Sequence, residues 1–148
     1  MSTNFKELIL KGRFAEAKSF SKHLSFEELD EELTDIAFTC PSMSIYTFMV
    51  SLLIEDEKIE FHEIAFELLV NPLCHIEGAY HAALYHARRC IALADKQALA
   101  GYLSYLLFLH EIPDKIIDDE EALAAAIKII ELDFDNKVAK EFLADKIR

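Results

Sequence analysis

The residues of this chain that could do chemistry include a group of histidines and cysteines. His86 and Cys90 stand four residues apart, so a helix would place them on one face, where they could chelate a metal ion with Cys74, His75 and His81. Structural zinc sites, however, usually take closely spaced pairs of ligands from two elements, and this sequence contains no such pairs. We therefore favour histidines that are hydrogen-bonded within the fold, and we predict no metal site.

Other catalytic patterns are incomplete. His62 and Glu63 begin the zinc-protease pattern HExxH, but Phe66 stands where the second histidine is required. Residues 133–136 lack the glycine and the distal glutamate of a calcium-binding loop. The phosphate-binding patterns GxxxxGK[ST] and GxGxxG and the nucleophile elbow GxSxG do not occur. We predict that the chain is not an enzyme and carries no cofactor.

The charge of the chain is strongly negative and is concentrated in one segment. Lys and Arg number 15 against 27 Asp and Glu, which gives a net charge of −12. Residues 27–67 contain twelve acidic residues and one basic residue, Lys58, a balance of −11. Such a field repels nucleic acid and anionic lipid and attracts basic proteins. Solvated helix faces that keep the protein soluble are the alternative explanation.

We predict that seven acidic residues of this segment contact a basic protein partner. The predicted contact set is Glu27, Glu28, Glu31, Asp35, Glu55, Asp56 and Glu57.

Composition predicts a single all-α domain over residues 1–148. The chain is 53% hydrophobic and has three glycines and three prolines, too few for the frequent turns of a β protein. The most apolar stretch, residues 45–54, is half the length of a membrane span and predicts a buried central helix. Three cysteines cannot all form disulfides, and no signal peptide is apparent, so we expect a cytoplasmic protein without membrane association.

Helix start and stop signals divide the chain into about nine helices. Asn4 is a candidate N-cap, Gly12 a helix stop, and Ser25 with Glu28 a capping box. Prolines and acidic turns separate the segments that follow. The first three expected helices span about residues 4–12, 14–23 and 25–40, and a fourth, capped by Ser42 or Ser44, runs to residue 54. The next three span about residues 59–70, 76–93 and 97–110. Asp118 caps the eighth helix, and Asp135 or Asn136 begins the last.

Three segments resemble tetratricopeptide (TPR) repeats. Residues 12–17 (GRFAEA) are similar to the turn between the two helices of a TPR hairpin, residues 124–143 to the junction of two repeats, and residues 86–103 more weakly. Phe134 stands where that family has proline, and no repeat is recognisable around residue 52. The resemblance implies stacked antiparallel helical hairpins of an α-solenoid type.

A fainter resemblance concerns residues 71–93 and 106–133. These segments are similar to small immunity proteins of bacterial toxin systems, which implies a non-catalytic inhibitor of a toxin.

Two functional interpretations follow. In the first, the chain is a bacterial immunity protein that neutralises a basic toxin domain, such as a nuclease, through the acidic segment 27–67. In the second, it is a TPR-like adaptor that holds a peptide or partner protein in a helical groove through aromatic residues such as Tyr80, Tyr85 and Tyr102. The salt dependence of partner binding distinguishes them. The sequence does not specify the oligomeric state.

Overall fold

The computed structural model describes residues 2–147, with side chains for residues 5–146. Within that part of the chain all regular structure is helical: there are nine α-helices and no strand, as the sequence predicts. Contacts between residues group the chain into two compact units, one ending at Ala83 and one beginning at Leu84. The expectation of one domain over the whole chain stays a prediction.

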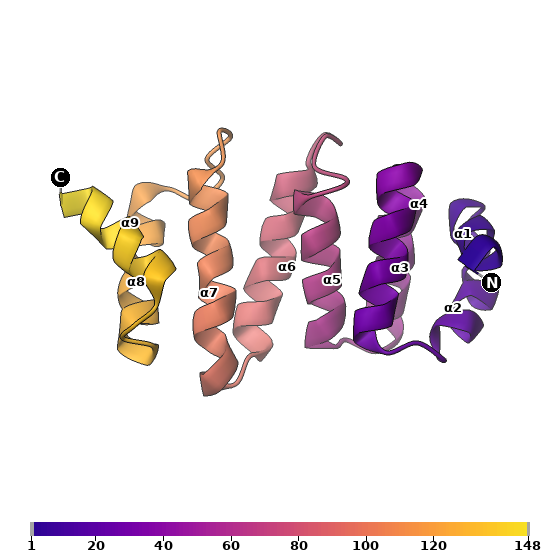
Figure 1. Cartoon of the computed structure of the whole chain (residues 1–148), viewed down its shortest axis with the longest axis horizontal. Coiled ribbons are helices and arrows are strands. Elements are labelled where there is room, and N and C mark those ends of the chain that lie inside the picture. Colours follow the sequence, from indigo (N-terminus) through magenta and orange to yellow (C-terminus); the bar gives the residue numbers. More distant parts are fainter. Residues whose placement is uncertain (1, 148) are drawn as a thin grey trace. The chain divides into compact units, whose positions relative to one another are not determined.

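Each unit is built from helices that are joined by short turns (Figure 1). Unit 1 contains α1 (Ser2–Leu10), α2 (Phe14–Ser21), α3 (Phe26–Thr39), α4 (Met43–Glu55) and α5 (Ile59–Val70). The helix α6 (Ala79–Leu93) crosses from unit 1 into unit 2, which also contains α7 (Lys96–Glu111), α8 (Asp119–Leu132) and α9 (Lys137–Ile147).

Local sequence signals explain where the first helices end and begin. Gly12 adopts φ +74°, and the N–H groups of Gly12 and Arg13 donate to the carbonyls of Ile9 and Leu8, which closes α1. Ser25 and the residue three positions on, Glu28, form the predicted capping box at the start of α3.

Two predicted helix starts are wrong. The helix α1 begins at Ser2, two residues before the predicted cap Asn4, whose side chain lies outside the described residues. The helix α6 begins at Ala79 and not at Ile76, because Gly78 takes φ +84° and interrupts the helical conformation.

The helix α4 is the centre of unit 1. It packs against α1, α2, α3 and α5, and its residues Ile45, Phe48 and Met49 are fully buried. The ring of Phe48 meets the rings of Phe5 and Phe14 edge to face, with centroids 5.9 and 5.6 Å apart. An apolar helix without a polar side must be covered on all sides, and this packing provides the cover.

Alanines allow the helices of unit 2 to approach closely. The antiparallel helices α7 and α8 pack along their length, and α9 packs against both. Ala122 and Ala126 of α8 are fully buried, as is Ala87 in the part of α6 that belongs to unit 2. None of the helices in the described part of the chain is both long enough and apolar enough to span a membrane.

A hydrogen-bonded carboxylate connects α7, α8 and α9 of unit 2. Asp119, the first residue of α8, accepts hydrogen bonds from Nε2 of His110 in α7 at 2.7 Å and from Nζ of Lys146 in α9 at 3.2 Å. Nζ of Lys115, in the turn between α7 and α8, lies 2.8 Å from the same oxygen. These donors, His110 first, hold the pKa of the Asp119 carboxyl well below its ordinary range.

We expect Asp119→Asn to lower the melting temperature of the protein at neutral pH. A carboxyl whose pKa is lower in the folded state stabilises the fold above its unfolded pKa of about 3.9 and loses that contribution as the pH falls towards the folded pKa. The difference between variant and parent should therefore shrink below about pH 4, as followed by circular dichroism. Glu120→Gln is the matched control, because Glu120 lies in the same helical turn and is exposed. Equal melting temperatures for parent and Asp119→Asn would contradict this role.

Candidate functional site

The helix α3 presents acidic side chains on one side and apolar side chains on the other. Leu29, Leu33 and Ile36 are buried in the core of unit 1. The remaining positions carry six acids, of which four are exposed. We call these four exposed residues the α3 acidic face: Glu27, Glu28, Glu31 and Asp35.

The carboxylates of α3 have no basic partner among the residues whose side chains are described. In the described part of the chain, no acid of α3 forms an ion pair with a lysine, arginine or histidine. Their hydrogen bonds are local: the Glu28 carboxylate accepts from the N–H of Ser25 at 2.9 Å, and Asp30 accepts from the hydroxyl of Thr34 at 3.2 Å. This negative charge is therefore left for solvent or for a partner.

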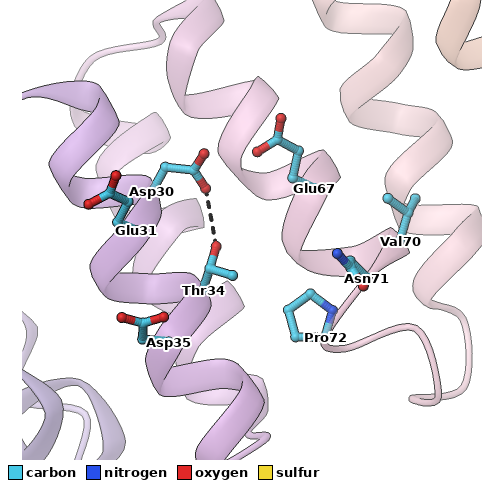
Figure 2. Close-up of a pocket in the computed structure, with 8 residues that line it drawn as sticks. All are labelled: Asp30, Glu31, Thr34, Asp35, Glu67, Val70, Asn71 and Pro72. Carbon is cyan, nitrogen blue, oxygen red and sulfur yellow. Dashed lines mark hydrogen bonds between the residues drawn. The ribbon is translucent and has the colours of Figure 1, made fainter.

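An acidic cleft of about 490 Å³ lies between α3 and α5. The two helices run in the same direction, and Figure 2 shows their carboxylates on the two sides of the cleft. The lining residues are Asp30, Glu31, Thr34, Asp35, Glu67, Val70, Asn71 and Pro72. Glu31 and Asp35 therefore belong both to the α3 acidic face and to the wall of the cleft.

Asp30 and Glu67 face each other across this cleft (Figure 2). Glu67 as a residue is exposed, but surrounding groups partly desolvate its carboxyl. That desolvation, followed by a hydrogen bond to Asp30 and by the charges of Asp30 and Glu63, raises the pKa of Glu67 to about 7. Near pH 7 about half of the Glu67 carboxyls therefore carry a proton, which lowers the negative charge on the α5 side of the cleft.

The acids of the turn between α4 and α5 differ from those of α3. Nζ of Lys18 lies 2.8 Å from Glu55, and Nζ of Lys58 lies 3.6 Å from Asp56. Oε2 of Glu57 lies 2.8 Å from Nε2 of the buried His62. The predicted contact set is thus in two parts, and only the part on α3 is without basic partners among the described residues.

The histidines and cysteines do not gather into a metal site. Among the described residues, no three side chains of His, Cys, Asp or Glu lie in an arrangement that could hold a metal ion. His86 and Cys90 are both buried, whereas Cys74 is half-buried and His75 is exposed.

The tyrosines of the alternative interpretation belong to different units. Tyr80 lies in the first turn of α6, in unit 1 and half-buried. Tyr85 is exposed and Tyr102 half-buried, and both lie in unit 2, where the ring of Tyr102 contacts that of Tyr105 edge to face at 5.7 Å. They therefore do not form one site within a single unit.

No protein-family model, characterised protein or solved structure matches the chain significantly. The functional argument therefore depends on the chemistry of the residues described above.

Asp30 and Glu67 were not part of the predicted contact set. Asp30 lies beside residues of that set, but its significance comes from Glu67, which is 37 positions away in the sequence. The apolar segment 45–54 predicts a buried helix that its neighbours must cover, and α3 and α5 both pack against it. That expectation is the only sequence signal that brings Asp30 near Glu67.

We expect Glu67→Gln to stabilise the protein above neutral pH. Because the folded state holds the proton of Glu67 more tightly than the unfolded chain, this contribution to stability is present below pH about 4.5 and is lost as the pH rises to about 7. A glutamine amide can donate to Asp30 at any pH. The full pKa shift would convert to roughly 3 kcal/mol, and partial exposure reduces our expectation to about 1 kcal/mol at about pH 8.

Urea denaturation at about pH 5 and pH 8 measures this effect. Glu60→Gln is the matched control, since Glu60 lies on α5 two turns before Glu67 and outside the cleft. A Glu67→Gln variant that is less stable than the parent at about pH 8 would contradict the raised pKa of Glu67.

Proposed function

We propose that this chain is a non-catalytic protein-binding protein whose α3 acidic face binds a basic protein partner. One observation carries the proposal: among the described residues, the acids of α3 have no basic partner. By contrast, Glu55 at the end of α4 and Asp56 and Glu57 in the turn that follows each lie beside a lysine or a histidine. Charge left uncompensated in the folded state costs stability and is useful when a partner of opposite charge supplies the compensation.

The arrangement favours fast association. Glu27, Glu31 and Asp35 follow one another at four-residue intervals, so their side chains form one stripe along α3. A partner with lysines or arginines at matching intervals meets several carboxylates at once, and electrostatic steering then raises the association rate by roughly 10 to 1,000-fold at low salt.

We further propose that the partner is a toxin and that the chain is its immunity protein. Nuclease toxins carry basic surfaces because they bind phosphate backbones, and an acidic face would compete for that surface. The resemblance of residues 71–93 and 106–133 to small immunity proteins supports this choice of partner. A gene for a large secreted toxin next to the gene of this chain would supply the candidate partner.

We expect neutralisation of the four residues of the α3 acidic face to slow association with a basic protein partner about tenfold at low salt. The variant combines Glu27→Gln, Glu28→Gln, Glu31→Gln and Asp35→Asn; glutamine at position 28 can keep the capping box. Stopped-flow measurements at about 20 mM and about 300 mM salt should show that the salt dependence becomes flatter.

The matched control removes the same charge from unit 2. It combines Asp114→Asn, Glu120→Gln, Glu141→Gln and Asp145→Asn, all at exposed positions. Equal association rates for the α3 variant and this control would contradict a specific role of α3. Binding that is insensitive to salt and is lost in Tyr85→Ala would favour the adaptor interpretation.

A further inference from the structure

All the charged residues that line the cleft between α3 and α5 are acidic. Asp30, Glu31 and Asp35 line it from α3, and Glu67 lines it from α5 (Figure 2). Among the described residues, no lysine, arginine or histidine contributes to its walls. The electric field inside the cleft therefore attracts a positive group and repels a negative one.

The rest of the lining fits a long cationic side chain better than a bare ion. Thr34, Val70, Asn71 and Pro72 complete the walls, and two of these residues are apolar. In the described part of the chain, no three carboxylates are arranged so that they could hold a metal ion. A lysine or arginine side chain combines a charged end with an apolar stem, so it can contact carboxylates and apolar groups at the same time.

Glu67 is the carboxyl of the cleft whose charge changes near neutral pH. The charged groups that act on it are Asp30 from α3 and Glu63 from its own helix, and both are acidic. The helix α4 also packs against α5, but its one charged residue, Glu55, lies outside the cleft and beside Lys18. Together with desolvation, the two acids raise the pKa of Glu67 to about 7.

We propose that the cleft receives a lysine or arginine side chain of the basic partner, and that this side chain replaces the proton of Glu67. The inference rests on the proposed function, because it states where a cationic side chain of that partner binds and how pH regulates the contact. A cation beside Glu67 favours the ionised form: the O–H bond breaks, the carboxylate keeps the electron pair, and the proton passes to the solvent. Binding therefore becomes tighter as the pH rises through about 7.

A lysine peptide tests this exchange on the full chain. The peptide carries four lysines separated by glycines, and its ends are acetylated and amidated, so its charge stays constant between about pH 6 and about pH 8. Isothermal titration at about 20 mM salt measures its affinity for the parent and for Glu67→Gln. We expect affinities within about twofold of each other at about pH 6, and roughly threefold to tenfold tighter binding by the parent at about pH 8.

The comparison with Glu67→Gln separates Glu67 from the other groups that titrate. The chain has six histidines, and histidine gains charge as the pH falls over this range, but that change affects parent and variant alike. Glu60→Gln is the matched control, since Glu60 lies on α5 outside the cleft, and it should show the pH dependence of the parent. Circular dichroism of each variant checks that it is folded.

The released proton can be counted directly. Titrations at about pH 6.5 in two buffers of different ionisation enthalpy give the number of protons released for each bound peptide. The parent should release about 0.3 to 0.5 proton more than Glu67→Gln, because Glu67 is mostly protonated in the free protein at that pH.

Each outcome decides between the proposals. The exchange is overturned by equal pH dependence for the parent and Glu67→Gln, by an equal loss of affinity at both pH values, or by no binding to the parent at about pH 8. Glu27 and Glu28 lie on the α3 acidic face outside the cleft, so their joint replacement by glutamine tests the proposed function separately. A loss of affinity in that double variant without the exchange leaves the proposed function standing. The exchange without any such loss supports the cleft and counts against the proposed function.

Discussion

The helix α4 has no polar side, and the arrangement of unit 1 depends on that constraint. Because Ile45, Phe48 and Met49 must all leave water, the neighbouring helices have to surround α4. Both α3 and α5 are bound to it, and they also pack against each other in the same direction. The burial of one apolar helix therefore brings the side chains of α3 next to those of α5, although the two helices are separated in the sequence.

This contact between α3 and α5 has a different character at each end. Near the helix starts, Phe26 and Phe61 meet edge to face, which is a favourable contact. About one turn further along α3, Asp30 faces Glu67, and its negative charge adds to the desolvation that raises the pKa of Glu67. The core could have been completed with neutral residues at these positions. Like charges beside a well-packed core are therefore a local conflict that packing alone does not require.

Local chemistry explains how much of this fold the sequence could predict. Ser25, Asp118 and Gly12 act on backbone groups within three or four residues, so the helix boundaries that they set can be found without knowledge of the tertiary structure. Gly78 was misjudged as part of a helix, because a glycine adopts positive or negative φ with similar ease.

The candidate site was less predictable, because its key pairs join separate helices. The register between α3 and α5 decides that Asp30 faces Glu67 and that Lys58 lies over the rings of Phe26 and Phe61, and no pattern within one helix specifies that register. Net charge identifies the acidic segment but does not separate the acids of α3, which have no basic partner among the described residues, from Glu55, which Lys18 neutralises. Charge compensation is a property of the packed structure.

The two unusual sites of the α3–α5 contact have one feature in common. In each, a positive group of the molecule itself lies beside acidic or aromatic side chains: the proton of Glu67 near neutral pH, and the ammonium of Lys58 beside the rings of Phe26 and Phe61. A cationic side chain placed beside Glu67 would favour its ionised form and expel the proton, so partner affinity would increase as the pH rises through about 7.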